Sequence, residues 1–548
     1  MRARRKLEAR AAERNRWTSS KNVIPKILRF AQKDRSVLMR RRELLLASAG
    51  LFGLAAVGSR RLLAAPKWQS DPFTLGVASG ELAADGFVIW TRLAPDPLNG
   101  GGMPDAAVEV EWVVAEDEQL TRIVRKGTAH ADPAWAHSVH VEVQGLKADR
   151  WYWYAFQAGG ARSQLGRSRT APLAGASAQR LCFAFASCQH YEHGYYAAYR
   201  HLAGDDLDCV LHLGDYIYES HSDKGVRSHG ADAPRTLADY RNRHALYKTD
   251  ADLQRAHARF PWIVTWDDHD VQNDYAGAHS EFDDPREDFL LRRAAAYQAY
   301  WEHLPLRYSA RPRGPDMTLY RRLEFGTLAR FFVADDRQYR DDQACGSPGH
   351  WGGEVVTNCP EREAPGRTLY GAAQERWLYD SMAASGAQWN VLAQQLLMAQ
   401  LDQKPGPERG WWTDGWDGYP AARQRLLTHM ADSKVKNPIV LGGDIHSFWT
   451  TDLKRDFDDP KSSIVATEFV GTSISSHGPP YDKFAQVLSK NPHVRFFDSR
   501  RRGYARCEIT PRSWRTDFMA LDDVREAASG IRRLASFTVE DGRPGAVS

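Results

Sequence analysis

The chain has 548 residues, of which 43% are hydrophobic and 26% charged, so it is longer than one typical domain and can bury a large core. Its formal net charge of +4 is misleading, because residues 1–65 hold 17 Lys and Arg but 4 Asp and Glu, which leaves the remainder acidic by about nine charges. An acidic remainder argues against nucleic-acid binding as such. The six cysteines are too few for a disulfide scaffold.

The N-terminal segment, residues 1–65, has the pattern of a twin-arginine signal peptide. Three arginines at 40–42 precede an apolar run at 44–57, and small residues follow at 64–65. A helix that spans a bilayer needs about 20 apolar residues, so a membrane anchor is the weaker interpretation and we expect no stable span in the mature form. Met39 is an alternative start. The segment predicts recognition by the twin-arginine export machinery and a periplasmic or extracellular location.

Residues 70–172 show short alternating apolar and polar runs separated by turn residues. Strands are predicted at 87–93, 107–115, 138–146 and 150–158. This pattern indicates a small β-sandwich of the immunoglobulin or fibronectin kind. No cluster of His, Asp and Cys stands out in this segment, so we expect a structural or substrate-shaping role.

Residues 180–517 alternate between strand-like apolar runs and helical stretches. Helices are predicted at 237–248, 288–301, 374–384 and 421–431. The alternation favours an α/β (α+β) domain of layered sheets flanked by helices. After residue 517 the pattern weakens, and residues 518–548 are expected to form a C-terminal tail.

Three short segments in this domain are rich in metal-binding side chains. They are GDYIYE at 214–219, WDDHDVQND at 266–274 and GGDIH at 442–446, and each follows an apolar strand-like run. Strand ends in α/β sheets are where ligands bind, so we expect the three segments to form one multinuclear metal site. Hard oxygen ligands with histidine suit Ca²⁺, Mg²⁺, Mn²⁺ or Fe³⁺ better than a closed zinc site. Metal-assisted hydrolysis of phosphate esters is the chemistry that this site suggests.

Individual side chains in these segments suit particular roles. The Asp215 carboxylate can bridge two cations, and the Tyr218 phenolate favours Fe³⁺, although a packed aromatic ring is an equal alternative for Tyr218. Asp268 and Asn273 offer oxygen ligands. Because adjacent side chains alternate in extended chain, the two ligands at 444 and 446 project the same way. Those two are Asp444 and His446.

Two further residues are expected to act on the substrate. His269 is the candidate for protonating the leaving group or for stabilising the phosphoryl charge. Arg337, in the segment FVADDRQYR together with Arg340, offers a planar fork that matches phosphate oxygens. The alternative for both arginines is a surface ion pair with Asp335 or Asp336.

The six cysteines differ in their sequence surroundings. Cys345 and Cys359 flank a glycine-rich loop and are the candidates for a disulfide. Cys182 and Cys209 lie in apolar runs and are expected to be buried bystanders. Cys188 ends the run LCFAFAS, where a metal ligand and a buried bystander are equally good interpretations. Cys507 lies in another strand-like run, YARCEIT.

Seven motifs together carry a family resemblance. FASCQ, LHLGDYIYE, TWDDHDVQND, DDRQYRD, NVLAQQ, DGWDGYPAAR and GGDIHSFW occur in this order behind the β-rich segment. They closely resemble the alkaline phosphatase D (PhoD-like) family, over roughly residues 70–516. The resemblance implies an exported enzyme with a calcineurin-like metallophosphoesterase core, one Fe³⁺ and two Ca²⁺ ions, acting on phosphomonoesters and phosphodiesters.

The resemblance also implies roles for particular residues. The iron ligands that it implies are Cys188, Asp215, Tyr218 and His446. The calcium ligands that it implies are Asp215, Asp268, Asn273 and Asp444, with Asp267 as an additional candidate because it is adjacent to Asp268. His269 takes the place of the catalytic histidine, and Arg337 resembles the arginine that contacts phosphate.

The function predicted from all of this is that of an exported alkaline phosphatase that releases inorganic phosphate from phosphate esters. The alternative on the same scaffold is a phosphodiesterase or phospholipase D-like activity. A non-catalytic binding module built around the β-domain is disfavoured, because such a module does not need this many metal ligands. The tryptophan-rich segment at 410–416 is expected to border and partly cap the mouth of the active site.

Overall fold

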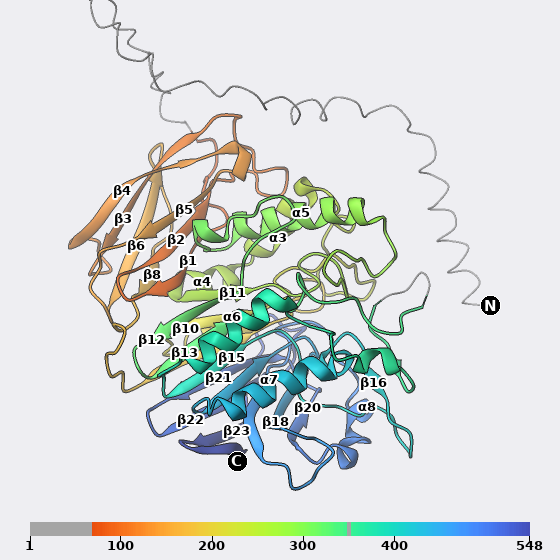
Figure 1. Cartoon of the computed structure of the whole chain (residues 1–548). Coiled ribbons are helices and arrows are strands. Elements are labelled where there is room, and N and C mark those ends of the chain that lie inside the picture. Colours follow the sequence, from red (N-terminus) through yellow and green to blue (C-terminus); the bar gives the residue numbers. More distant parts are fainter. Residues whose placement is uncertain (1–67, 348–351) are drawn as a thin grey trace, which may run out of the picture. The chain divides into compact units, whose positions relative to one another are not determined.

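The structure is a computed structural model that describes residues 68–347 and 352–548 (Figure 1). The predicted N-terminal extension and signal peptide, residues 1–65, lie outside the described residues. In chain order the strands are β1 (Val77–Ala83), β2 (Gly86–Arg92), β3 (Val108–Ala115), β4 (Ile123–Ala131), β5 (Ser138–Val143), β6 (Trp151–Ala158), β7 (Ala161–Arg162), β8 (Gly166–Arg169), β9 (Leu181–Ala186), β10 (Cys209–Leu213), β11 (Pro261–Thr265), β12 (Arg321–Phe325), β13 (Ala329–Val333), β14 (Val355–Val356), β15 (Trp389–Ala393), β16 (Trp411–Trp412), β17 (Pro438–Gly442), β18 (Phe448–Lys454), β19 (Ile464–Val470), β20 (Val494–Asp498), β21 (Gly503–Ile509), β22 (Ser513–Leu521), β23 (Ile531–Glu540) and β24 (Arg543–Val547). The helices are α2 (Ala197–Leu202), α3 (Leu237–Lys248), α4 (Ala251–Arg259), α5 (Arg286–His303), α6 (Gly371–Ala383), α7 (Pro420–Asp432) and α8 (Tyr481–Ala485).

The β-rich segment at residues 70–172 forms two sheet layers, as predicted. Strands β4, β3, β6 and β7 pair in that order, and β8 also pairs with β6. The facing layer consists of β1, β2 and β5. Apolar side chains from both layers, among them Phe87, Ile89, Val110 and Tyr154, pack between them. The four strands expected from the alternating pattern correspond to β2, β3, β5 and β6, and that prediction is confirmed.

The second layer of this segment is continuous with the main sheet of the chain. Strand β1 pairs in parallel with β11, at Ser79 with Pro261 and at Gly80 with Trp262. The ten-stranded sheet therefore runs in the order β24-β23-β22-β21-β9-β10-β11-β1-β2-β5. The β-rich segment at residues 70–172 and the following domain thus share backbone hydrogen bonds.

Two sheets pack face to face at the centre of the following domain. The second sheet has seven strands in the order β12-β13-β15-β17-β19-β18-β20. Phe183 of β9 and Phe331 of β13 meet between the sheets, with ring centroids 5.4 Å apart. Neighbouring side chains of a strand point to opposite faces of its sheet. Phe183 therefore packs between the two sheets, whereas the next residue, Ala184, packs on the outer face of the ten-stranded sheet. Helices cover the outer faces, α2 to α5 on the ten-stranded sheet and α6 with α7 on the other.

This arrangement confirms the predicted class of layered sheets flanked by helices, and the four predicted helices appear as α3, α5, α6 and α7. Local signals explain where helices begin. Helix α3 starts at a capping box, in which Thr236 and Asp239 satisfy each other's backbone N–H groups. Helix α7 begins with Pro420, whose fixed φ suits the first helical position.

The expectation of a C-terminal tail was wrong. Strand β22 continues to Leu521, and β23 and β24 extend the ten-stranded sheet at its edge. Strand β23 was missed because few of its side chains are buried, so its alternating pattern is weak. Only Phe537 and Val539 are buried in it, while Arg532 and Arg533 are exposed. Among the described residues, no helix combines the length and the apolar character needed to cross a membrane.

The carboxyl ends of parallel strands place the metal-binding segments. Strands β9, β10 and β11 are mutually parallel in one sheet, and β13, β15, β17 and β19 in the other. Cys188, Asp215 and Asp267 follow strands of the first sheet. Arg337 and Asp444 follow strands of the second. The site therefore forms where the carboxyl ends of two packed sheets meet.

Candidate metal centre

Two of the segments are held together by a close backbone approach. A Cβ atom at Gly214 would lie 2.4 Å from the Cβ atom of Asp267, so only glycine allows this contact. The Asp270 carboxylate ties the same loops, because it accepts from the backbone N–H groups of Asp215 at 2.9 Å, Asp267 at 3.0 Å and Ile217 at 3.2 Å. Asp270 therefore shapes the loops and does not offer its oxygens to a cavity.

Several of the predicted ligands have left-handed backbone conformations. The φ angles are 58° at Cys188, 56° at Asp215, 62° at Asp444 and 54° at His446. Each such residue other than glycine costs on the order of 1 kcal/mol. Backbone strain of this kind gathers at functional sites, where the surrounding structure holds it.

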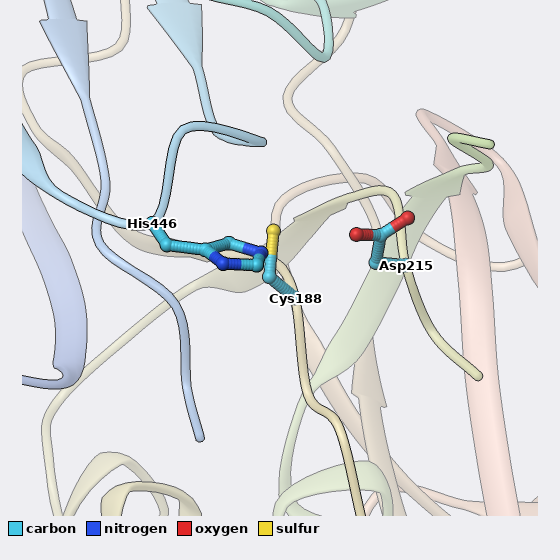
Figure 2. A group of neighbouring side chains, drawn as sticks. All are labelled: Cys188, Asp215 and His446. Carbon is cyan, nitrogen blue, oxygen red and sulfur yellow. The ribbon is translucent and has the colours of Figure 1, made fainter. Parts of the chain in front are cut away.

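Three of these side chains converge from separate loops (Figure 2). One ligand atom each from Cys188, Asp215 and His446 lies within 4.8 Å of the others. The Tyr218 hydroxyl lies between two of them, 2.7 Å from Asp215 Oδ2 and 3.1 Å from His446 Nε2. His446 Nδ1 donates to the carbonyl oxygen of His477 at 2.7 Å, which leaves Nε2 as the ring atom available for a ligand. The structure thus brings together the four residues that the resemblance implies for iron.

A group of carboxylates lies beside the first group. Ligand atoms of Asp267, Asp268 and Asp444 lie within 4.8 Å of one another, and Asp268 also groups with Asp215 and His269. In the described part of the chain, Asp267 Oδ2 and Asp268 Oδ1 are buried without a hydrogen-bond partner. A buried anionic oxygen without a partner is costly, so these atoms fit a role as ligands of bound cations.

The electrostatics of the group also fit cations. Burial, reinforced by the charge of Asp268, raises the pKa of Asp215 well above its usual range. Burial and the neighbouring Asp267 do the same to the pKa of Asp444. Burial raises the pKa of Asp267 to about 7, against the opposing charge of Arg337. The protein by itself therefore cannot keep all of these carboxylates ionised, and bound cations would remove the penalty.

The thiolate form of Cys188 would also need a positive charge beside it. Its side chain is 1% exposed, and burial together with the charge of Asp215 raises the pKa of the thiol well above its usual value. Burial also lowers the pKa of His446 to about 3, so that its imidazole is neutral, the form that binds metals. A thiolate at this position requires a cation beside it.

Arg337 differs from the expectation of a phosphate clamp. Its side chain is fully buried, and Nε bonds to Asp267 Oδ1 at 2.5 Å while Nη1 bonds to Asp414 Oδ1 at 2.8 Å. A guanidinium that water cannot reach is also out of reach of a substrate in the cavity. Nη2 points toward Asp268 and Asp444, at 3.7 and 3.8 Å. Arg337 therefore neutralises and orients the carboxylates from behind. Arg340 likewise bonds within the protein, at 3.0 Å to Asp414.

His269 lies at the edge of the carboxylate group and is held by Glu219. Its Nδ1 is 2.7 Å from Glu219 Oε2, and its ring centroid is 4.1 Å from that of Tyr218. Burial would lower the pKa of His269, but the charges of Glu219, Asp268 and Asp215 outweigh burial and raise it well above its usual value. With Nδ1 donating to Glu219, a hydrogen on Nε2 remains available for another acceptor.

A cavity of about 260 Å³ opens beside these groups. It is lined by polar residues of the predicted site, namely Asp215, Asp268, His269, Asn273, Asp444 and His446. The lining also includes the apolar residues Leu397, Leu401, Trp412, Ile445 and Phe484. The tryptophan-rich segment borders the cavity as predicted, through Trp412 and Trp416, whereas Trp411 packs against arginine side chains outside the lining.

Comparisons with known proteins agree with this geometry. A model of the PhoD-like phosphatase family matches residues 183–518, and a model of the N-terminal domain of PhoD-like phosphatases matches residues 58–172. The chain belongs to the PhoD-like phosphatase family. It is 49% identical over 507 residues to alkaline phosphatase D of Bacillus subtilis (strain 168), a match that covers 91% of this chain and 86% of that one. A solved structure of PhoD matches with a TM-score of 0.85 and 49% identity, covering 88% of this chain and 94% of the other.

Membership in this family makes the protein a phosphoric ester hydrolase and confirms the family expected from the motifs. It disfavours the non-catalytic binding module. The relatives are named as phosphatases, so the phosphodiesterase alternative is not favoured.

Sequence reasoning missed two site residues of this phosphatase. Asp414 lines the cavity, and its Oδ1 accepts from Arg337 and Arg340 and, at 2.6 Å, from Gln343 Nε2. It lies in the tryptophan-rich segment, where a single carboxylate among aromatic residues was the available signal. Glu219, the partner of His269, ends the motif GDYIYE and is 6% exposed.

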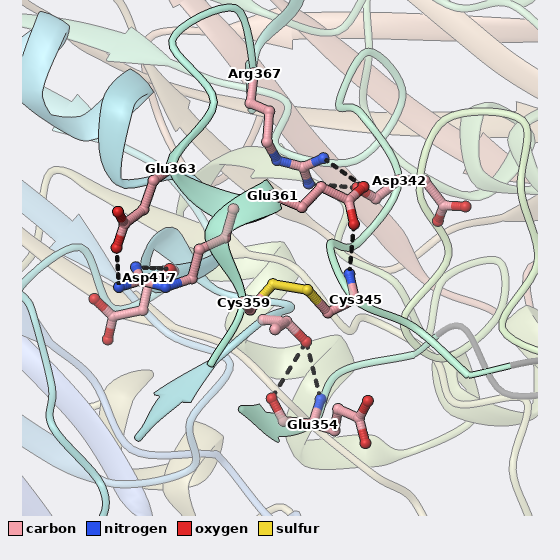
Figure 3. The surroundings of a disulfide bond; sticks show 10 residues. Asp342, Cys345, Glu354, Cys359, Glu361, Glu363, Arg367 and Asp417 are labelled. Atoms are coloured by element: carbon pink, nitrogen blue, oxygen red, sulfur yellow. Dashed lines mark hydrogen bonds and ion pairs between the residues drawn. A yellow bond between two sulfur atoms is a disulfide. The ribbon is translucent and has the colours of Figure 1, made fainter. Parts of the chain in front are cut away.

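A disulfide closes the loop that carries β14, and Figure 3 shows its surroundings. Cys345 and Cys359 are bonded, with Cα atoms 6.0 Å apart, and the Cys345 N–H donates to Glu361 Oε2 at 3.1 Å. The loop between them carries β14, which pairs with β16 and so contacts Trp412. The bond thus restrains the strand that presents Trp412 to the cavity. Cys182, Cys209 and Cys507 are free and buried.

Proposed function

We propose that this protein is an exported alkaline phosphatase that hydrolyses phosphate monoesters with a mixed centre of one iron and two calcium ions. The observation that carries the proposal is the pairing of a sulfur, phenol and imidazole group with buried carboxylate oxygens that have no hydrogen-bond partner in the described part of the chain. Soft and phenolic donors suit iron, and carboxylate oxygens suit calcium.

The two kinds of metal would be held by different residues. Iron would bind Cys188, Tyr218 and His446. Calcium would bind Asp268, with further ligands from the loops after β11 and β17. Asp215 lies next to both groups and would be shared. The remaining calcium ligands in this proposal are Asn273 and Asp444, with Asp267 as an additional one.

When bound, the cations would polarise the phosphoryl oxygens and neutralise their charge. The protein itself contributes orientation and a proton. Arg337 keeps Asp267 fixed and offsets part of the carboxylate charge from behind. Glu219 holds His269 by Nδ1, so a hydrogen on Nε2 would be directed to the leaving oxygen. No serine nucleophile is part of this scheme.

The metal assignment is tested by elemental analysis of variants matured in the cell. Cys188→Ser should lose iron and keep calcium. Asp444→Asn should lose calcium and keep more iron than Cys188→Ser does. Tyr218→Phe should weaken the visible charge-transfer absorption expected of an iron phenolate. Cys182→Ser, a buried cysteine in β9 away from the cavity, is the matched control and should change neither metal. Full iron content in Cys188→Ser would contradict the assignment.

The substrate class is tested on the purified protein with p-nitrophenyl phosphate and bis(p-nitrophenyl) phosphate, before and after chelation. Faster turnover of the monoester, lost on chelation, is the expected result. A clear preference for the diester would favour the phosphodiesterase alternative, and the absence of turnover on both esters would overturn the proposal.

Export by the twin-arginine pathway completes the proposal. It rests on the arginines at 40–42 ahead of an apolar run. The Cys345–Cys359 disulfide supports a periplasmic or extracellular location, because such bonds persist in oxidising compartments. Replacing all three arginines with lysine should retain the enzyme in the cytoplasm, as measured by fractionation. Unchanged export of that variant would contradict the pathway.

A further inference from the structure

One lysine side chain lines the cavity beside the aromatic rings of Trp412 and Phe484. Among the described residues that line the cavity, Lys483 of α8 is the one lysine or arginine. The other charged lining residues are carboxylates or the histidines of the metal centre. A single ammonium group in a cavity whose other charged lining groups are carboxylates and histidines is a candidate contact for an anionic group of a ligand.

The ammonium group of Lys483 is available for a ligand. Its Nζ lies 5.1 Å from the ring centroid of Phe484 and 6.0 Å from that of Trp412. In the described part of the chain, no carboxylate lies within ion-pair distance of this Nζ atom. The Lys483 residue is also exposed to solvent. Partial burial lowers the pKa of Lys483, whereas the nearby ring faces favour its ammonium form.

The position of the metal centre decides what Lys483 can reach. If the proposed function holds, the reacting phosphoryl group lies against Asp215, Asp268 and His269, and the leaving group extends into the rest of the cavity. That part is lined by flat or branched apolar side chains, among them Leu401 and Trp412. A leaving group with an apolar body would be bound there by burial.

We propose that Lys483, Trp412 and Phe484 form a leaving-group subsite that selects phosphate esters whose leaving group carries a second anion. The rings would contact the body of the leaving group, and the ammonium would pair with a carboxylate or phosphate at its far end. The inference rests on the proposed function, because it places the phosphoryl group at the carboxylate side of the cavity. It names the substrate class as organic phosphates with two anionic groups.

The test uses two aryl phosphates that differ in charge and hardly in shape. They are 4-carboxyphenyl phosphate and its neutral amide counterpart, 4-carbamoylphenyl phosphate, and the measured quantity is the ratio of their kcat/KM values. An ion pair near solvent is worth about fivefold in such a ratio. Lys483→Gln should lower the ratio by about fivefold, and Lys483→Glu should lower it further by repulsion. Lys126→Gln, on the exposed strand β4, controls for the loss of one positive charge and should leave the ratio unchanged.

An unchanged ratio in Lys483→Gln would overturn the subsite. If that unchanged ratio came with an equal loss of kcat/KM on both esters, Lys483 would act on the reacting phosphate instead. A bis-phosphorylated aryl ester in the same assay distinguishes phosphate from carboxylate as the favoured second anion.

Binding without turnover separates this inference from the proposed function. Calorimetry with 4-carboxybenzyl phosphonate and 4-carbamoylbenzyl phosphonate should show tighter binding of the carboxylate, by about fivefold, in the wild type but not in Lys483→Gln. If the wild type hydrolyses neither ester yet shows this difference, the proposed function fails and the subsite stands. Equal binding of both phosphonates to the wild type would overturn the subsite.

Discussion

Replacing Gly214 with alanine should disrupt the metal centre by separating two loops. The new Cβ atom would lie 2.4 Å from the Cβ atom of Asp267 and 2.8 Å from its backbone nitrogen. Carbon atoms in contact are about 3.5 to 4.0 Å apart, so the loops would have to move by about 1 Å. We expect a loss of about 2–4 kcal/mol in stability, from overpacking together with the φ of +107° at this position.

The effect on activity should be larger than the effect on stability. A displacement of about 1 Å at reacting groups can cost about 100-fold in rate, and Asp215 follows Gly214 directly. The assay is kcat/KM on p-nitrophenyl phosphate together with metal content and melting temperature. Gly160→Ala is the control, because its φ is +84° but nothing lies within 4 Å of the added Cβ atom. It should cost about 1 kcal/mol and leave activity intact. Wild-type metal content and kcat/KM in Gly214→Ala would refute the reasoning.

Three further perturbations test other parts of the structure. Burial lowers the pKa of Lys248 in the folded protein from 10.5 to about 7. Between these two pH values the unfolded chain therefore binds one more proton than the folded protein. The free energy of unfolding should rise with pH across this window by up to about 5 kcal/mol. Lys248→Met should remove that rise, and a constant difference in melting temperature between the two proteins from pH 7 to 10.5 would contradict it. Glu219→Gln should lower kcat by about 10- to 100-fold with little change in KM, because His269 loses its anionic partner; an unchanged kcat would show that the pair is only structural. Double replacement of Cys345 and Cys359 by serine should lower the free energy of unfolding by up to about 3 kcal/mol, measured with denaturant. It should also raise KM for aryl esters more than for methyl phosphate, because β14 pairs with the strand that carries Trp412. Equal changes in KM would show that the disulfide does not affect the cavity.

Much of the fold could be predicted from the sequence, because its signals are local. The run LCFAFA is apolar at every position, as expected of β9, which is buried on both faces. The capping residues of helix α3, Thr236 and Asp239, lie just before and within its first turn. The strand β23 could not be predicted with the same ease, since only two of its residues reach the core and its pairing with β22 spans a turn.

The sequence by itself determined the types of ligand and their attachment to strand ends. Cys188, Asp215 and Asp444 each follow a buried strand, and parallel strands place such residues at one edge of a sheet whatever the details of packing. The metal-binding character of the site could therefore be predicted from residue type and local pattern. The donors of the metal centre could be recognised before any contact between them was known.

Only the tertiary structure decided how those groups are arranged and what surrounds them. Arg337 is enclosed among carboxylates instead of facing the cavity, and Glu219 reaches His269 across 50 residues of sequence. The apolar wall with Lys483 comes from segments far apart in the chain. Burial, pKa and the reach of a side chain depend on the distances between such segments, and those distances follow from how the two sheets pack and not from any local pattern.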